Sequence, residues 1–436
     1  MATVTNDRAE QGRFRDQAVL DSQLLRQAAL EAGADDAAVA NVHDPLLATQ
    51  AADAERLLPG AKTFVSLAIT MNSIHIRSPY LGVANGEFRF AGERADRAAH
   101  NLANLLAAEG VRAAAVPVAF PMDMHCWPGK AWVLSHKTIA ESAGLGRIGL
   151  SRNLLHPRFG TFTLLATVVI DRPVDRYGER LERSPCIGCK SCVRACPTGA
   201  IGETGAFNFI NCMTHNYRYR LGGFVDWVES IADGRETYRR RFSDAETVSM
   251  WQSLSYGANY TCCNCMGACP AGTEYLEEYQ ADPQRYDREV VQDLLHRGGG
   301  VFVLPGSDAE ARASALFPAE RVRRVRSGVR PRSARAFLAS LPLVFQPGQA
   351  KDVHAAYHFV FSGADPVAGT VRIDGAKLTV VDGAEGRADL TISARGDDWL
   401  AILIGDLHPV WAVMTGRLKL KGDRKKLRDF QRCFPL

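Results

Sequence analysis

The chain has no long apolar run and little net charge. No stretch of its 436 residues approaches the ~20 apolar residues that a membrane-spanning helix needs. The formal net charge is +4, which is too small to argue for binding to nucleic acid or to a membrane surface. Residues 1–16 lack both the apolar core of a secretion signal and a twin-arginine pair. We therefore expect a cytoplasmic protein that binds no nucleic acid.

Cysteine, by contrast, is plentiful, and its spacing carries the main signal. Nine of the 11 cysteines lie from Cys186 to Cys269, and eight of them form a pattern. They read Cys186-x-x-Cys189-x-x-Cys192-x-x-x-Cys196-Pro197, then Cys212, then Cys262-x-x-Cys265-x-x-x-Cys269-Pro270. The first run has the spacing of bacterial two-cluster ferredoxins, in which the fourth cysteine ligates the other cluster. This pattern predicts a protein that transfers single electrons.

Each [4Fe–4S] cluster needs four thiolates, so eight cysteines predict two clusters. Crossing of the chain assigns Cys186, Cys189, Cys192 and Cys269 to one cluster, and Cys196, Cys212, Cys262 and Cys265 to the other. A disulfide framework is disfavoured in a long chain without a secretion signal, and zinc sites usually space paired C-x-x-C units far apart. Cys263 adjoins the second motif, but only Cys262 keeps its spacing.

The length predicts two or three domains. Apolar residues recur at helical spacing over 17–33 and 93–109, and short β-rich runs at 63–70, 111–119 and 161–171 predict strands. This alternation predicts an α/β domain over 15–180, and the cysteines place a double-cluster module at 181–290.

Two arginine-rich segments follow. The 49 residues between Cys212 and Cys262 are rich in Arg, Tyr and Trp, which favours a solvated basic helix over a lid or a docking patch for an acidic electron donor. Residues 322–335 combine dense positive charge with Gly and Pro. We interpret them as the end of a linker that spans 291–335.

The remaining residues, 336–436, alternate with period two. Runs at 358–363, 371–375, 377–383 and 389–393 predict an antiparallel meander, because the first three each end at a glycine. A helix at 397–405, a strand at 416–421 and a helix at 424–434 complete a predicted α+β domain.

The segment from His136 to Asn153, with the eight cysteines after it, resembles the epoxyqueuosine reductase and reductive dehalogenase group over about 20–290. The resemblance implies a nitroreductase-like α/β core that holds cobalamin, with two clusters forming an electron path to cobalt. It implies cofactor contacts for Gly144, Gly146, Gly149 and Asn153. Glycine there lets backbone approach the corrinoid or a helix, since it has no Cβ.

One position departs from the queuosine-forming members of that group. They carry a proton-donating Asp at the position of Lys130, and a Glu at that of His136. The residues available to donate a proton near cobalt are Lys130, then His125, then Asp123. A buried Lys donates readily when desolvation lowers its pKa, and an unperturbed His titrates near neutral pH. The substitution argues against epoxyqueuosine reduction.

Residues 330–436 resemble the sterol carrier protein 2 (SCP2) domain, chiefly through Gly416-Arg-Leu-Lys-Leu-Lys-Gly-Asp423. The resemblance implies an apolar tunnel for a hydrophobic ligand, although a packing or dimerisation module is the alternative. Together the two resemblances predict a cobalamin-dependent iron–sulfur reductase that cleaves carbon–halogen or carbon–oxygen bonds of a hydrophobic small molecule. A ferredoxin or flavodoxin-type protein would donate the electrons. The alternative is a ferredoxin-like carrier with a lipid-binding docking domain.

Overall fold

A computed structural model describes residues 12–257, 259–326 and 330–435. The chain divides into two compact units, and each is described by itself. The N-terminal unit comprises Met1–Met122, Trp132–Cys192 and Asn264–Leu294; the C-terminal unit comprises Asp123–Ala131, Val193–Cys263 and Leu295–Leu436. The predicted cluster module at 181–290 therefore contributes to both units. In the described residues, no helix is long and apolar enough to cross a membrane.

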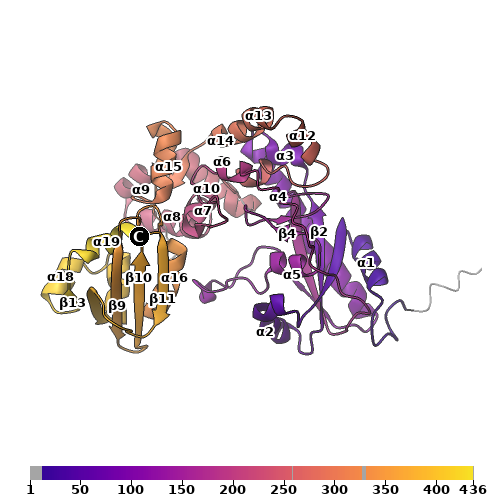
Figure 1. Cartoon of the computed structure of the whole chain (residues 1–436), viewed down its shortest axis with the longest axis horizontal. Helices are drawn as coiled ribbons and strands as arrows, with labels where there is room; N and C mark the ends of the chain where they lie inside the picture. The colour runs from indigo at the N-terminus through magenta and orange to yellow at the C-terminus, as the bar shows by residue number, and fades with distance from the viewer. Residues whose placement is uncertain (1–11, 258, 327–329, 436) are drawn as a thin grey trace, which may run out of the picture. The chain divides into compact units, whose positions relative to one another are not determined.

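A four-stranded sheet forms the centre of the N-terminal unit (Figure 1). Its order is β1-β2-β6-β3, and every neighbouring pair is antiparallel. The strands are β1 (Asp36–Asn41), β2 (Thr63–Thr70), β3 (Ala113–Val116) and β6 (Thr163–Ile170). The predicted strands are confirmed, with β3 shorter than expected. Helices and strands alternate along the chain, yet they form no parallel βαβ unit in this sheet.

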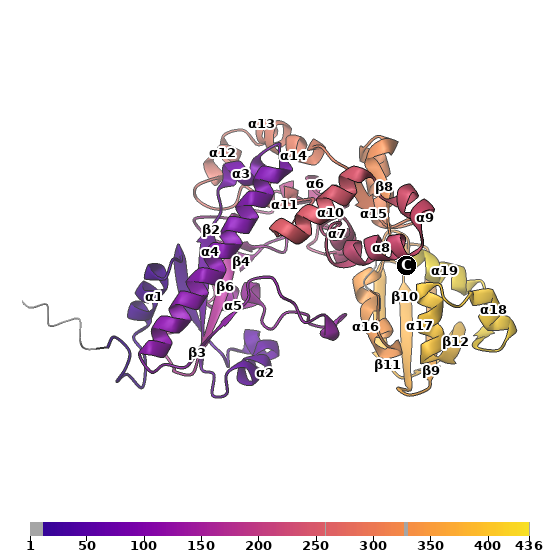
Figure 2. The ribbon, with the colours of Figure 1, turned by 180° about the vertical axis from the view of Figure 1, so that it is seen from behind.

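Helices cover both faces of this sheet. The long helix α4 (Leu81–Ala108) crosses one face (Figure 2), and its buried side chains are all Ala or Leu at helical spacing. The short helix α5 (His136–Ser142) packs on the other face through Ile139 and Ala143. The remaining helices before the cysteines are α1 (Ser22–Glu31), α2 (Ala48–Leu57) and α3 (Ser73–Arg77).

The last segment of the N-terminal unit is tied to α3. Arg77 donates from Nε to the Gly267 carbonyl oxygen at 3.0 Å and from Nη2 to the Tyr286 hydroxyl at 2.8 Å. The short elements of this unit are β4 (Arg147–Ile148), β5 (Leu154–Leu155), α11 (Asn264–Gly267), α12 (Leu276–Ala281), α13 (Pro283–Tyr286) and a π-helical turn at Asp287–Gln292. Helices α6 (Ser191–Arg194) and α14 (Asp293–His296) lie where the chain passes between the units.

The first half of the C-terminal unit is mostly helical, with α7 (Phe209–Asn216), α8 (Leu221–Ala232), α9 (Arg235–Arg241) and α10 (Asp244–Tyr256). The prediction of a solvated basic helix is wrong for Arg218, which is only 1% exposed. Its guanidinium donates to Asp226 at 2.9 Å and to Glu246 at 3.4 Å, and it lies over the Phe242 ring. Buried carboxylates compensate its charge, so this arginine can leave the solvent.

The prediction that 291–335 is a linker is also wrong for most of that span. Strands β7 (Val301–Val303) and β8 (Val322–Arg324) pair in parallel, and helix α15 (Asp308–Leu316) connects them. Val301, Val303, Ala309, Ala313 and Phe317 form their small apolar core. Residues 327–329 of the predicted linker lie outside the described residues. The arginine content of 322–335 hid the strand, because β8 buries little.

The C-terminal five-stranded sheet has the order β11-β10-β9-β12-β13. Its strands are β9 (His354–Ser362), β10 (Val367–Asp374), β11 (Lys377–Asp382), β12 (Leu390–Arg395) and β13 (Leu418–Gly422). The helices are α16 (Ala334–Val344), α17 (Gly396–Ile404), α18 (Pro409–Met414) and α19 (Lys426–Cys433). The meander is confirmed for β9–β11, but β12 pairs with β9 in parallel. Phe337, Phe359 and Trp399 lie at the centre of its aromatic core.

Candidate iron–sulfur site

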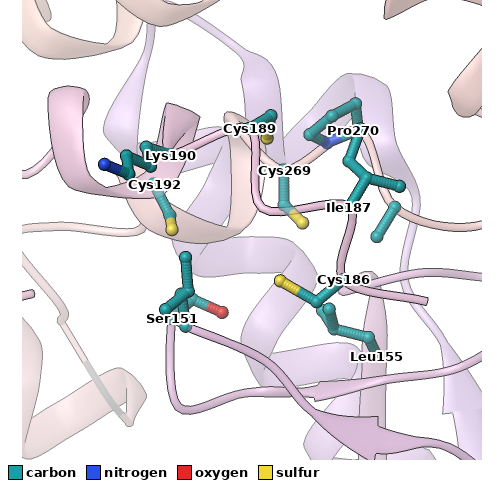
Figure 3. A pocket seen from close by; sticks show the side chains of 11 residues that line it. Ser151, Leu155, Cys186, Ile187, Cys189, Lys190, Cys192, Cys269 and Pro270 are labelled. Atoms are coloured by element: carbon teal, nitrogen blue, oxygen red, sulfur yellow. The ribbon is translucent and has the colours of Figure 1, made fainter. Parts of the chain in front are cut away.

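Four predicted cluster ligands line one pocket of the N-terminal unit (Figure 3). They are Cys186, Cys189, Cys192 and Cys269, and the picture shows the sulfur atoms of Cys186, Cys192 and Cys269 facing a common space. Cys269 lies 77 residues after Cys192 in the sequence, so only tertiary folding brings it to the first three. These four cysteines are the ones that chain crossing assigns to the first cluster.

The loop around these cysteines has a backbone suited to an anion. Gly188 and Lys190 both have left-handed φ angles, +70° and +59°, and such residues let successive N–H groups line a concave surface that binds iron–sulfur clusters. For Lys190 the left-handed conformation is strained, because a side chain is present. The segment Cys186–Cys192 is therefore shaped by its backbone as well as by its thiols.

Besides the thiols, the pocket lining is mostly apolar, with Ser151 and Lys190 as the polar side chains. Leu150, Leu155, Ile187 and Ala271 contribute to its lining. Burial raises the pKa of the Cys269 thiol to about 12, and the neighbouring thiols of Cys192, Cys189 and Cys186 also raise it. Thiolates are the form that binds metal, so the site needs a positive group to hold four of them together. Iron supplies such a charge, and the donor set fits a [4Fe–4S] cluster.

A close backbone contact positions the Cys269 loop. Gly160 has a left-handed φ of +58°, and a Cβ there would lie 1.8 Å from the Ala271 carbonyl oxygen. Thr273 N–H also donates to the Pro157 carbonyl oxygen at 3.0 Å. The segment after Cys269 therefore packs directly on the turn that precedes β6, and glycine is required at that turn.

Among the described residues, no three or more His, Cys, Asp or Glu side chains are grouped to hold a metal ion. A four-iron cluster makes a different demand, since each of its four thiolates binds a separate iron atom. Its ligands surround a volume instead of converging on one point.

The second predicted set divides between the units. Cys196, Cys212 and Cys262 belong to the C-terminal unit and Cys265 to the N-terminal unit. Helix α7 links two of them, because it carries Cys212 and ends at Asn216, whose Oδ1 accepts from the Cys262 N–H at 3.1 Å. Arg312 donates to the Cys196 carbonyl oxygen at 2.9 Å. The four-member set remains a prediction from spacing.

Cys263 has a different environment from Cys262. Its side chain is buried and accepts from Arg297 Nη1 at 3.1 Å. Burial raises the pKa of this thiol, while the Arg297 charge opposes that shift. Spacing favours Cys262 as the ligand, and the arginine contact accounts for Cys263 within the protein. The other cysteines differ again: Cys126 is exposed and Cys433 is buried.

Comparisons with known proteins support a 4Fe-4S domain and an SCP2 segment in this chain. Residues 182–202 match the 4Fe-4S binding domain model. Residues 346–435 match the SCP-2 sterol transfer family. Epoxyqueuosine reductase from Staphylococcus aureus (strain NCTC 8325 / PS 47) is 33% identical over 100 residues, which are 21% of this chain and 26% of the relative. The enzyme of the same name from Listeria monocytogenes serovar 1/2a is 26% identical over 173 residues, 39% of this chain and 38% of the relative.

Among solved structures, the catabolic reductive dehalogenase NpRdhA is similar at 14% identity and a TM-score of 0.40, covering 70% of this chain and 39% of that one. The chain spans about two-fifths or less of the two curated relatives. It therefore resembles epoxyqueuosine reductase over part of its length and joins that part to an SCP2 segment.

The residues predicted to contact cobalamin lie in the N-terminal unit and make contacts within the protein. A Cβ at Gly144 would meet the Glu179 backbone, and one at Gly146 would meet the Leu155 backbone, both at 2.4 Å. A Cβ at Gly149 would lie 2.6 Å from the Leu155 side chain. Chain packing accounts for these glycines, and their contact with a cofactor stays a prediction.

The predicted proton donors lie in the C-terminal unit. Asp123 caps a 3₁₀ turn at Met124–Cys126, and its carboxylate accepts from the His125 N–H at 3.0 Å. Arg332 Nη1 donates to His125 Nδ1 at 2.6 Å, so that nitrogen carries no proton. Lys130 is partly exposed. Trp127 packs near Phe209 and fixes this segment to the unit.

His136 lies in the N-terminal unit on α5, where the related queuosine-forming proteins are expected to carry Glu. Its Nε2 donates to the Pro117 carbonyl oxygen at 3.0 Å, and its Nδ1 forms a hydrogen bond with the Thr167 hydroxyl at 2.8 Å. Burial lowers the pKa of this histidine, although the Pro117 hydrogen bond opposes the shift. Both ring nitrogens are thus hydrogen-bonded, which makes His136 an anchor between α5 and β6.

Sequence reasoning missed two groups of residues. Leu150, Ser151, Leu155 and Ile187 line the first pocket, although none of them was predicted to contact a cluster. Asn216 and Arg312 contact the backbone of Cys262 and Cys196, respectively, from positions far along the chain. The sequence contained no signal for these contacts, because each depends on where α7 and α15 fold.

Proposed function

We propose that this chain is an iron–sulfur reductase that depends on cobalamin and cleaves a bond of a hydrophobic small molecule. The observation that carries the proposal is the pocket formed by Cys186, Cys189, Cys192 and Cys269. It provides a complete thiol set for one [4Fe–4S] cluster. The second cluster, with Cys196, Cys212, Cys262 and Cys265, is proposed from spacing.

Two clusters suit the stoichiometry of reductive cleavage. Replacing a carbon-bound halogen by hydrogen consumes two electrons and one proton and releases halide. Removing an oxygen from an epoxide as water consumes two electrons and two protons. Each cluster passes one electron at a time, and a ferredoxin or flavodoxin-type protein would supply both electrons in turn.

Cobalamin is proposed from the resemblance to the epoxyqueuosine reductase and reductive dehalogenase group. When bound, a corrinoid supplies a strongly reducing metal centre, and cofactors of this kind carry the hard chemistry. Gly144, Gly146 and Gly149 pack against the protein itself, and their contact with the corrinoid stays a prediction. Lys130, His125 and Asp123 stay our candidates for donating the proton.

The C-terminal domain is proposed to bind the hydrophobic substrate or present it. Its hydrophobic core contains aromatic rings that include Phe337, Phe359, Phe361 and Trp399. The Trp399 indole nitrogen is buried and has no hydrogen-bond partner among the described residues. An unpaired buried donor costs about 1–3 kcal/mol, and a ligand oxygen in this interior would remove that cost. An apolar ligand with one oxygen acceptor therefore suits the domain.

Anaerobic reconstitution of the full chain with iron, sulfide and hydroxocobalamin tests the proposal. The expected result is roughly eight irons per chain, a corrinoid that stays bound through gel filtration, and cobalt signals in EPR spectra. Eight irons with no retained corrinoid would instead identify an electron carrier with a lipid-binding domain.

Epoxyqueuosine reduction is the second candidate, because the curated relatives carry that name. Expression of the chain in a strain that lacks its own epoxyqueuosine reductase tests this function. Restored queuosine in the tRNA of that strain would replace a small-molecule substrate by tRNA. We expect no restoration, since Lys130 stands where those enzymes are expected to carry the proton-donating Asp.

A further inference from the structure

A chain of hydrogen bonds within the N-terminal unit ends on a predicted cluster ligand. Lys137, on α5, donates from Nζ to the Arg152 carbonyl oxygen at 2.9 Å and to Asn153 Oδ1 at 3.4 Å. Asn153 in turn donates from Nδ2 to Cys265 Sγ at 3.9 Å, at the long end of the range for a bond to sulfur. The amide of Asn153 therefore lies between an ammonium group and a thiol.

The backbone holds both ends of this chain in place. Arg152 has a left-handed φ of +62°, a conformation that costs a residue with a side chain about 1–2 kcal/mol. The Gly149 N–H donates to the Asn153 carbonyl oxygen at 3.0 Å and closes the turn. At the other end, α11 carries Cys265 and is anchored by Arg77 through the Gly267 carbonyl oxygen. Strain of this kind persists where surrounding structure enforces it, often at functional sites.

The Asn153 side chain is not needed for the turn itself. The bonds that close the turn are Gly149 N–H to Asn153 carbonyl and Arg152 N–H to Gly149 carbonyl, and both are between backbone groups. The side-chain amide instead points its oxygen to Lys137 and its nitrogen to Cys265.

Such a chain acts on the charge of a bound cluster. Hydrogen bonds to cluster sulfurs are one of the factors that set the reduction potential. An N–H donor stabilises the more negative, reduced cluster more than the oxidised one, so it raises the potential. The Lys137 ammonium polarises the amide and strengthens the bond, because hydrogen bonds in series reinforce one another.

We propose that Asn153, polarised by Lys137, is a positioning residue that raises the reduction potential of the cluster bound through Cys265. The inference rests on the proposed function, in which Cys265 ligates the second cluster. It replaces the predicted role of Asn153 in binding the corrinoid.

The test is a redox titration of the reconstituted full chain, followed by EPR, with the iron content measured on each sample. Asn153→Leu keeps the side-chain volume and removes the donor. At the wild-type midpoint potential of one cluster, we expect the ratio of reduced to oxidised cluster to fall by up to about tenfold, a shift of up to ~59 mV for one electron. The other cluster should keep its potential.

Two further variants keep the inference falsifiable if Asn153→Leu fails to fold. Asn153→Asp should lower the same potential further, because it adds a negative charge, and Lys137→Met should lower it as well. If Lys137 acts through Asn153, the double variant Lys137→Met/Asn153→Leu should shift the potential by less than the sum of the single shifts. Lys62→Met is the matched control, because it removes one positive charge of the same unit at a residue outside this chain of hydrogen bonds.

The outcomes separate the two claims. Equal potentials in wild type and Asn153→Leu, with iron content unchanged, would overturn the inference and leave the proposed function standing. A Cys265→Ala chain that retains both clusters would overturn both the inference and the predicted ligand set. An equal shift in Lys62→Met and Lys137→Met would show a general charge effect and would also overturn the inference.

Discussion

Gly160→Ala tests how the fold holds the first cysteine set. Gly160 has a φ of +58°, and a Cβ there would lie 1.8 Å from the Ala271 carbonyl oxygen, two residues after Cys269. The left-handed conformation costs an alanine about 1–2 kcal/mol. The clash is with backbone, which cannot rotate away, and overpacking of this kind costs about 1–3 kcal/mol more. We expect a loss of roughly 2–5 kcal/mol in the free energy of unfolding of the N-terminal unit.

Gly60→Ala is the matched control. Gly60 is in the same unit and has a φ of +86°, and a Cβ added there would meet no atom within 4 Å. The free energy of unfolding of Gly60→Ala should therefore fall only by the cost of the left-handed conformation, about 1–2 kcal/mol. The difference between the two variants isolates the contact between Gly160 and the Cys269 loop.

Denaturant unfolding followed by circular dichroism measures the stability, and iron analysis of the reconstituted chains measures the cluster. Gly160→Ala should bind roughly four fewer irons than Gly60→Ala, because relief of the clash displaces the loop that carries Cys269. Equal stability losses in the two variants, with equal iron content, would refute the argument that this contact positions the site.

Three other predictions follow from particular contacts. Cys269→Ala should lose about four irons while Cys263→Ala keeps them; iron analysis of both decides whether Cys263 is a ligand, and loss in Cys263→Ala would contradict the assignment. Arg218→Met should destabilise the C-terminal unit by about 3–5 kcal/mol, since it leaves Asp226 and Glu246 buried without this cation. The control Arg239→Met removes an exposed pair with Asp244 and should cost less than about 1 kcal/mol. Similar unfolding midpoints for the two variants would disprove the prediction. Partial burial raises the pKa of Asp36, but hydrogen bonds from His156 and Arg26 outweigh it and lower the pKa to about 2. This stabilisation, roughly 2 kcal/mol, is complete above the unfolded pKa near 4 and is lost as the pH falls toward 2. His156→Phe should therefore reduce the loss of stability between these pH values in a stability–pH curve. An unchanged curve in that range would argue against the Asp36–His156 pair.

Local pattern was sufficient for much of the secondary structure. Strand β2 begins and ends where its apolar run does, at Thr63 and Thr70, because nearly every side chain of this central strand is buried. In the C-terminal domain, glycines marked the turns of β9–β11 for the same local reason. The parallel pairing of β12 with β9 escaped prediction, since the partner of a strand depends on where the intervening chain runs.

Arginine-rich sequence led to wrong predictions of solvent exposure and of a linker, because burial of these segments depends on their partners in the fold. Arg218 looked like part of a solvated basic segment, yet two carboxylates and an aromatic ring surround it. Strand β8 looked like a linker because Arg323 and Arg324 interrupt its apolar pattern. A charge in the sequence says nothing of its partners, which lie 8 to 77 residues away in these cases.

The sequence by itself determined the electron-transfer chemistry of this protein, because thiol number and spacing specify an iron–sulfur cluster without reference to the rest of the fold. Tertiary structure decided which groups surround those thiols. It placed Cys269 beside Cys186, Cys189 and Cys192, engaged Gly144 and Gly146 in chain packing, and turned Asn153 toward Cys265. These assignments depend on distances between segments far apart in the chain, and such distances are set by packing of the whole unit.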